Sequence, residues 1–385
     1  MYLTWIAFKY IIIFFPTLMF YLEKHKSTKS HIFEKIGILF LILVSFLRYG
    51  TGRDYFSYEE IYQYIANGRE FFIQKEPLAY LLFKISGELS LPYSILIGFI
   101  STFFITTVYI VILKKVPLKY RYVGVFFFLI INANYFTSVA TIRQSLAVGF
   151  FVIAMHFYNK SNIKLLFFMG VGALFHMSLW LVIPIIYLIK KISYKGFYYL
   201  LVPYVFLFIF PNILPILIDN VLNLIGIHDI YRSYLYIETQ SLNLRSILKN
   251  ISYIIIAVQF FIFVNLLRKN EANYYIKLLL IGLLLHLYIS VGFSVLTRLL
   301  PYFYIFYPIV IVELLKTYKM KNGTIMFIFF ILFAINNVKQ IALPIEYSKY
   351  FGQYQLIIFK TSQDIEQDRS IYQSEERMIK LNRLK

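Results

Sequence analysis

The chain has 385 residues, of which 60% are hydrophobic, 20% aromatic and only 15% charged, with a net charge of +19. This composition lies far from that of soluble domains and excludes a soluble catalytic protein. It contains no cysteine, which excludes disulfides, thiolate metal sites and cysteine nucleophiles. Its histidines show no HxxH or HExxH spacing, so no metal site is expected.

Apolar runs of roughly 18 to 25 residues recur along the chain, which is the length that crosses a bilayer core. The first run, residues 3–22, has no small-residue cleavage site and is expected to be a retained helix. Further crossings are expected at residues 36–47, 92–113, 122–135, 138–158, 197–218, 248–268, 278–292, 294–315 and 324–342. The sequence therefore predicts an all-α, polytopic integral membrane protein with about 10–12 transmembrane helices.

Lysine and arginine in the loops orient these crossings by the positive-inside rule. Residues 48–91 and 219–247 are then outer loops, and the stretch "EPLAYLLFKISGELS" at 76–90 is expected to be an amphipathic surface helix. Residues 1–342 form a single transmembrane domain, and residues 343–385 form a polar C-terminal tail. The basic residues lie in short loops between apolar runs, so nucleic acid is not an expected partner.

Residues 165–189 have lysines at both ends, so one straight crossing would place one group of lysines on the wrong side. A pair of short helices that meet near His176 removes this conflict. Backbone at such a break is tolerated only inside protein or beside a water-filled cavity. The sequence thus predicts a broken or re-entrant helix at this position.

Arginine and lysine are distributed differently on the two expected sides. The expected inner loops, at residues 23–35, 114–121, 159–164, 190–196, 268–277 and 316–323, hold 17 lysines and 2 arginines, whereas outer or intramembrane positions before the tail, apart from Lys9, hold 4 lysines and 7 arginines. Only a guanidinium offers a planar fork that binds phosphate through two parallel hydrogen bonds. This pattern favours a phosphate-bearing ligand on the outer side. The alternative is ion pairing with the outer acids, which are Glu59, Glu60, Glu70 and Glu76.

Two arginines lie within apolar segments. Arg143 follows the start of the segment "TIRQSLAVGFF" beside Gln144, and no acidic residue occurs between Glu88 and Asp219. Arg298, in "TRLLPYFYIFYP", precedes a proline-broken aromatic helix. An intramembrane arginine without a nearby carboxylate is a functional candidate, and a snorkelling arginine is the alternative. Together the two could hold the phosphates of a pyrophosphate.

Two residues are candidates for the base that deprotonates an acceptor hydroxyl. Neutral imidazole at His176 could accept the proton near pH 7, although a hydrogen-bonded core histidine is the alternative. Asp54 follows the second expected crossing in "RYGTGRDYF" and could act instead, or it could cap the loop. In the outer loop 219–247 and at the start of the next crossing, tyrosines alternate with Arg232 and Arg245, a combination that suits sugar faces and phosphates.

Three elements of the chain resemble the Wzy-type polysaccharide polymerases of O-antigen and capsule synthesis, in particular the EpsG-like branch. They are "RYGTGRDYFSYEEIY", the segment "IRQSLAVGFFVIAMHFY" followed by "KLLFFMGVGALFHMSLWLVIP", and "TRLLPYFYIFYPI". The resemblance implies a GT-C-like arrangement of helices in the cytoplasmic membrane, with the active site facing outward. It also implies inverting, metal-independent glycosyl transfer without a cofactor.

Under this resemblance the donor is a glycan on undecaprenyl pyrophosphate and the acceptor is a lipid-linked repeat unit. A flippase and a chain-length regulator are the partners that it suggests beside the lipid bilayer. Residues implied to bind substrate are Arg143, Arg298, Arg48, Arg53, Gln144, Arg232, Arg245 and Tyr58. Catalysis would fall to Asp54 or His176. The alternatives are a flippase or transporter of lipid-linked oligosaccharides, and another lipid-phosphate-dependent glycosyl- or acyltransferase.

Overall fold

The computed structural model of the chain is helical throughout the residues that it describes, apart from one short pair of strands, which confirms the all-α expectation. The structure describes residues 2–25, 31–50, 54–69, 76–131, 134–136, 141–209, 244–290, 294–319, 324 and 355–356. In the first part of the chain the elements are α1 (Tyr2–Lys24), α2 (Ile32–Phe46), β1 (Arg48–Tyr49), α3 (Tyr55–Ala66), α4 (Pro77–Glu88), α5 (Tyr93–Val111), η2 (Leu113–Lys115), η3 (Leu118–Tyr120), α6 (Arg121–Ile130) and α8 (Ile142–His156).

The second part of the chain begins at the predicted broken segment. Its elements are α9 (Asn162–Phe175), α10 (Ser178–Ile189), α11 (Tyr194–Ile209), α14 (Leu244–Lys269), α15 (Tyr274–Ser290), η4 (Ser294–Leu299), α16 (Leu300–Tyr304), α17 (Tyr307–Tyr318) and β2 (Gln355–Leu356). The strands pair antiparallel, so that Arg48 lies opposite Leu356. This pairing connects the C-terminal part of the chain to the residue that follows α2.

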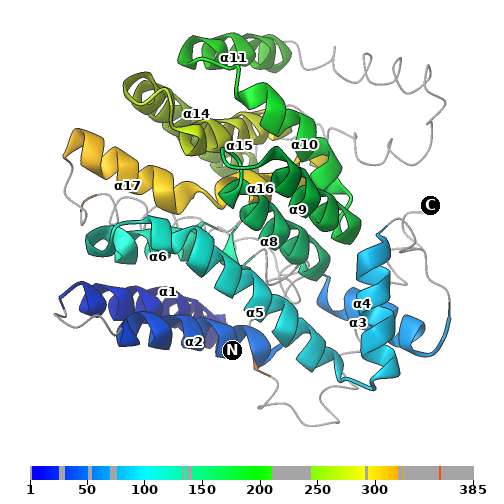
Figure 1. The fold of residues 1–385 in the computed structure, drawn as a ribbon. Helices are drawn as coiled ribbons and strands as arrows, with labels where there is room; N and C mark the ends of the chain where they lie inside the picture. The colour runs from blue at the N-terminus through cyan, green and yellow to red at the C-terminus, as the bar shows by residue number, and fades with distance from the viewer. Residues whose placement is uncertain are drawn as a thin grey trace, which may run out of the picture.

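The helices pack mainly as neighbouring antiparallel pairs, as Figure 1 shows. Helix α1 packs against α2 and α6, α5 packs between α2 and α8, and α14 packs against α15. Helices α3 and α4 pack on each other at one side of the bundle, next to the start of α5 (Figure 1). The helix predicted over this stretch is therefore confirmed as α4, which has Pro77 at its first turn, where proline costs no hydrogen bond, while its location at a membrane surface stays a prediction.

Two separate apolar cores hold the helices together. The larger core contains side chains from most helices, including Phe126, Phe151 and Phe303. The smaller core is rich in tyrosine and joins α3 and α4 to the first turns of α5 and α8, where Ile142 and Leu146 lie. The small core therefore positions the outer segment against the helix that carries Arg143.

One described helix has the length and hydropathy of a bilayer span, namely Tyr93–Lys115 with 23 residues and a mean hydropathy of 2.4. The pair Leu296–Tyr304 and Tyr307–Tyr318, bent by 53°, adds a second if it counts as one broken span. The shorter apolar helices have 10–17 residues, and at about 1.5 Å per residue each is shorter than a bilayer core of roughly 30 Å. The expected set of about 10–12 crossings therefore stays a prediction.

Hydropathy placed several boundaries incorrectly because it does not register a turn between two apolar helices. The segment expected to run from 122 to 135 ends as a helix at Ile130. The segment expected at 294–315 is divided into η4, α16 and α17, and Pro301 and Pro308 each lie at the start of one of these helices. Both segments remain helical, but neither is a single straight crossing.

The segments predicted as inner loops lie together at one end of the bundle. Arg121 Nη1 lies 2.6 Å from Glu34 Oε1, and this ion pair joins loop 23–35 to loop 114–121. The ammonium of Lys115 lies 5.0 Å from the ring centroid of Tyr275, which joins 114–121 to 268–277. Ring contacts of Tyr158 with Tyr274 and Lys190, at 4.7 and 4.6 Å, add loops 159–164 and 190–196. Asn270 donates to Thr317 at 3.3 Å and adds the last loop.

Candidate functional site at the helix break

The break between α9 and α10 lies where the sequence predicts it. His176 ends α9 in an extended conformation, with φ −152° and ψ 116°, and α10 begins at Ser178. The side chain of His176 is buried, with 8% of the residue exposed. Protein therefore shields His176 and Ser178 at the break, whereas Met177 between them is exposed.

Hydrogen bonds fix the tautomer of His176. The backbone N–H of Ser178 donates to His176 Nδ1 at 3.3 Å, and Ser178 Oγ lies 2.7 Å from the same nitrogen. Because Nδ1 accepts, the neutral ring carries its proton on Nε2. Ser178 Oγ also lies 3.0 Å from the buried hydroxyl of Tyr302, which belongs to α16. This chain of contacts orients the imidazole so that Nε2–H can donate to a ligand oxygen.

Arg143 lies on the first turn of α8 and forms an ion pair with Glu76, the residue that precedes α4. Glu76 also accepts from the backbone N–H of Met177 at 3.2 Å, so its carboxylate joins α4 and α8 to the helix break. The sequence offers Arg143 no carboxylate nearby in the chain, and its partner is instead Glu76, one of the outer acids considered as alternative ion-pair partners. The partner lies 67 residues earlier in the sequence, beyond the reach of any argument from neighbouring positions.

The Arg143 guanidinium also contacts Tyr58. Its central carbon lies 5.0 Å from the ring centroid of Tyr58, in α3, which places a predicted substrate residue against it. Its Nε is buried and has no hydrogen-bond partner among the described residues. A buried donor without a partner is costly, and such positions often belong to a ligand site.

The α8 helix also contacts the late element that contains Arg298. The side-chain amide of Gln144 donates to the backbone carbonyl of Arg298, so the two predicted residues touch. Both Arg143 and Arg298 lie near enough to His176 to act electrostatically on its ring. The structure therefore places Arg143 against Tyr58, and the backbone of Arg298 against Gln144, with both cations close enough to influence His176, while Arg298 itself is exposed.

Asp54 lies at the start of α3, one turn before Tyr58. It acts electrostatically on the Tyr58 hydroxyl, which also lies beside Arg143. The predicted base is thus near the edge of the cluster, on the outer segment, and its side chain is partly exposed.

Arg48 lies apart from this cluster. Its residue is 1% exposed, and its Nη1 donates to the Ser45 carbonyl at 3.1 Å and to the Ser101 hydroxyl. Ser45 is in the last turn of α2, where backbone carbonyls lack helical partners and a cation is favourable. Arg48 therefore acts as a buried helix cap, which differs from the predicted contact with a diphosphate. Arg53 and Arg232 lie outside the described residues, as does the side chain of Arg245.

The sequence interpretation did not single out three members of the cluster. Glu76 was considered only as one of several outer acids, Ser178 only as part of the helix-break motif, and Tyr302 only as part of the late aromatic motif. Their motifs could have suggested the last two, because each lies within four residues of a chosen residue. No group of three potential metal ligands occurs among the residues that the structure describes.

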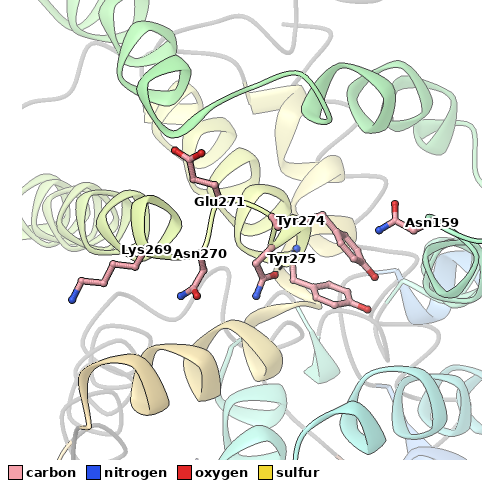
Figure 2. A pocket seen from close by; sticks show the side chains of 8 residues that line it. Asn159, Lys269, Asn270, Glu271, Tyr274 and Tyr275 are labelled. Carbon is pink, nitrogen blue, oxygen red and sulfur yellow. Dashed lines mark hydrogen bonds between the residues drawn. The ribbon is translucent and has the colours of Figure 1, made fainter.

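A pocket of about 600 Å³ lies at the opposite end of α8, beyond its last residue (Figure 2). Asn159, Lys269 and the residues of the α14–α15 turn line it, and Figure 2 shows Tyr274 and Tyr275 at its wall. The 15 residues of α8 rise by about 22 Å, which separates this pocket from Arg143. It belongs to the end where the predicted inner loops meet, and it contains none of the predicted site residues.

The fold and the cluster define an all-helical protein that presents guanidinium and imidazole donors at a buried helix break, a site suited to phosphate oxygens. A profile of the EpsG family matches residues 31–355, and the chain belongs to this family. Membership supports a glycan-polymerase-like role and an association with membranes. Neither a curated protein nor a solved structure matches the sequence.

Proposed function

We propose that this protein is a multi-pass glycan polymerase of the cytoplasmic membrane. It transfers a growing glycan from undecaprenyl pyrophosphate to a lipid-linked repeat unit at the outer face of the membrane, with inversion and without a metal. The observation that supports the proposal is that α8, which carries Arg143 and Gln144, contacts the backbone of Arg298, and that both arginines lie close enough to His176 to influence it, in a member of the EpsG family.

The leaving group of this reaction is already a lipid pyrophosphate, so the enzyme must stabilise the negative charge that develops on it. Arg143 and Arg298 supply guanidinium forks for this charge, and Nε2–H of His176 supplies a neutral donor. Gln144 ties the backbone of Arg298 to α8 and thereby limits the distance between the two cations. Such fixed donors favour the transition state because they need not reorganise during the reaction.

The acceptor hydroxyl must lose its proton as the new glycosidic bond forms. The tautomer of His176 favours a donor role at Nε2, which leaves Asp54 as the better candidate for the base. The proton would pass from the sugar hydroxyl to the Asp54 carboxylate, while the bond between the donor sugar and the pyrophosphate breaks. His176 as the base remains the alternative, and the comparison of variants in the Discussion separates the two.

The proposed orientation follows from the two ends of the bundle. The lysine-rich loops meet at the end with the pocket of Figure 2, and the arginine cluster lies at the other end of α8. A cysteine replacing exposed Asn67 should react with a membrane-impermeant thiol reagent on intact cells, and one replacing Asn159 should react only after lysis. The opposite labelling pattern would overturn the orientation.

The function is tested in a strain that lacks the gene and receives either the native chain or Arg298→Ala. The native chain should restore a ladder of long polymer on a gel, and the variant should leave only single-repeat product. Arg69→Ala is the matched control, because Arg69 is an exposed arginine on the same predicted side whose guanidinium lies over the ring of Tyr64. Loss of single-repeat product as well would indicate a flippase, and full-length polymer from Arg298→Ala would contradict the proposed site.

A further inference from the structure

The Glu76–Arg143 ion pair is incomplete. Nη1 of Arg143 contacts the carboxylate and the guanidinium also bonds Tyr58, but Nε is buried without a hydrogen-bond partner among the described residues. The other carboxylate oxygen accepts the backbone N–H of Met177, which lies at the start of the 12-residue helix α10. The carboxylate therefore occupies a place where a cation, a backbone N–H and a helix N-terminus converge, all of which favour an anion.

A second buried ion pair in the same chain shows what a completed pair looks like. Arg121 Nη1 lies 2.6 and 2.8 Å from the two oxygens of Glu34, and Arg121 Nε donates to the Val116 carbonyl at 3.3 Å. The Tyr109 hydroxyl donates to the same carboxylate at 2.9 Å. In the Glu34 pair both carboxylate oxygens accept hydrogen bonds from Arg121. The Nε of Arg121, which corresponds to the open Nε of Arg143, also has an acceptor. The Arg143 pair thus differs from the saturated Glu34 pair, although Nε of the buried helix cap Arg48 is also without a hydrogen-bond partner among the described residues.

We infer that Glu76 is a resident anion that sets the specificity of the site for diphosphates. This inference rests on the proposed function. Glu76 holds Arg143 in the absence of substrate, and a lipid diphosphate displaces the carboxylate and also takes up the open Nε donor. A phosphodiester lipid carries a single negative charge, as the Glu76 carboxylate does. It therefore gains little free energy by displacing Glu76 from Arg143 and does not occupy the site.

The physical basis of this selection is the difference in charge between the competing anions. Displacing Glu76 means that one carboxylate–guanidinium contact is lost, so only a ligand with stronger charge and more acceptor oxygens recovers that free energy. A diphosphate has both, because its two phosphoryl groups can span Arg143 and the nearby donors. Without Glu76, Arg143 would attract the abundant phosphodiester head groups of the membrane as well.

The test measures binding by the purified full-length chain in detergent, with farnesyl diphosphate and a short-chain phosphatidylglycerol as probes. Glu76→Gln keeps an amide oxygen for the Met177 N–H but removes the charge. It should bind both probes more tightly, phosphatidylglycerol by roughly tenfold or more, so that the preference for the diphosphate falls. Glu34→Gln is the matched control, because it neutralises a buried paired carboxylate at the other end and should leave both affinities unchanged.

Unchanged or weaker binding of both probes by Glu76→Gln would overturn the inference, as would an equal effect of Glu34→Gln. If Glu76→Gln does not fold, Glu76→Asp keeps the charge on a shorter side chain that weakens the pair, and it should lower the preference by a smaller factor. An equal preference in Glu76→Asp and the native chain then counts against the inference. If the native chain binds no farnesyl diphosphate and restores no polymer, the proposed function itself fails.

Discussion

Two buried glutamate–arginine pairs of this chain contain the same side chains but differ in how many of their hydrogen-bonding groups have partners. At the end where the predicted inner loops meet, Glu34 is 0% exposed, and both its oxygens and the Nε of Arg121 are satisfied. At the other end of the bundle, Arg143 is 23% exposed as a side chain and leaves Nε open. One pair fastens helices together, and the other leaves a donor for a further group.

The difference teaches how to separate a structural charge from a functional one in an apolar bundle. Burial does not distinguish them, since both carboxylates are buried. The two pairs differ in hydrogen-bond saturation. A pair whose donors and acceptors all have partners offers no group to a ligand, whereas an unpartnered donor beside other donors can bind one. The surroundings agree, because Arg143 and Arg298 both lie close enough to influence His176, while Arg121 donates to the Val116 carbonyl and shares Glu34 with Tyr109.

The largest expected effect is on stability and is similar for both pairs. Arg143→Ala or Arg121→Ala leaves a buried carboxylate uncompensated and should lower the free energy of unfolding by about 3–5 kcal/mol. Adding Glu76→Gln or Glu34→Gln, respectively, should recover much of the loss. Denaturant unfolding of the purified chain measures this. A single variant as stable as the native chain would show that its pair contributes little.

Polymer yield should differ between the two pairs, and the effect is expected to be somewhat smaller in free energy than the effect on stability. The double variant Glu76→Gln with Arg143→Gln should lower polymer yield by about 100-fold or more, which is typical for loss of a preorganised charge donor. The double variant Glu34→Gln with Arg121→Gln should keep most of the yield at equal protein level. Polymer is quantified on gels from the complemented deletion strain. Equal losses in both doubles would remove the distinction drawn above.

A smaller effect distinguishes the two roles of His176. Glutamine can place an N–H near the position of Nε2, whereas asparagine cannot, so His176→Gln should retain roughly tenfold more polymer synthesis than His176→Asn if the ring donates. Neither amide can accept a proton, so equal inactivity of both variants supports the base role instead. His286→Gln and His286→Asn serve as controls, because His286 bonds Tyr304 outside the cluster.

The smallest effect concerns the hydroxyl chain behind His176. Tyr302→Phe removes the contact with Ser178 and should cost about 0.5–1.5 kcal/mol of stability, with a few-fold loss of polymer. Tyr307→Phe, which removes a hydrogen bond to Gln259 elsewhere in the core, should cost similar stability without affecting the yield at equal protein level. If Tyr302→Phe gives the same polymer yield as Tyr307→Phe, the Tyr302 hydroxyl contributes to stability but not to activity.

Much of the fold could be predicted from the sequence because the signals are local. Lysines at both ends of one apolar segment predicted the break at His176, and the positive-inside rule predicted loops that meet at one end. Helix breaks at Pro301 and Pro308 were harder to place, since apolar periodicity continues across them. Hydropathy therefore recovered the helices better than it recovered their lengths.

The candidate site was predictable only in part. The motifs of the family resemblance supplied Arg143, His176 and Arg298, and the structure brings them together. The partner of Arg143 could not be found in this way, because pairing across 67 residues depends on tertiary packing and leaves no periodic trace. The same holds for the contact of Arg48 with Ser101 in α5, which lies 53 residues away in the sequence.

Glu76 immediately precedes α4, and this helix exposes Leu81, Ile85 and Leu89 on its surface. A shift of α4 relative to surrounding lipid would change the distance between the Glu76 carboxylate and the Arg143 guanidinium. Acyl-chain length and detergent therefore become experimental variables in their own right. Assays that compare variants in different hydrophobic media would confuse the influence of the medium with that of the mutation.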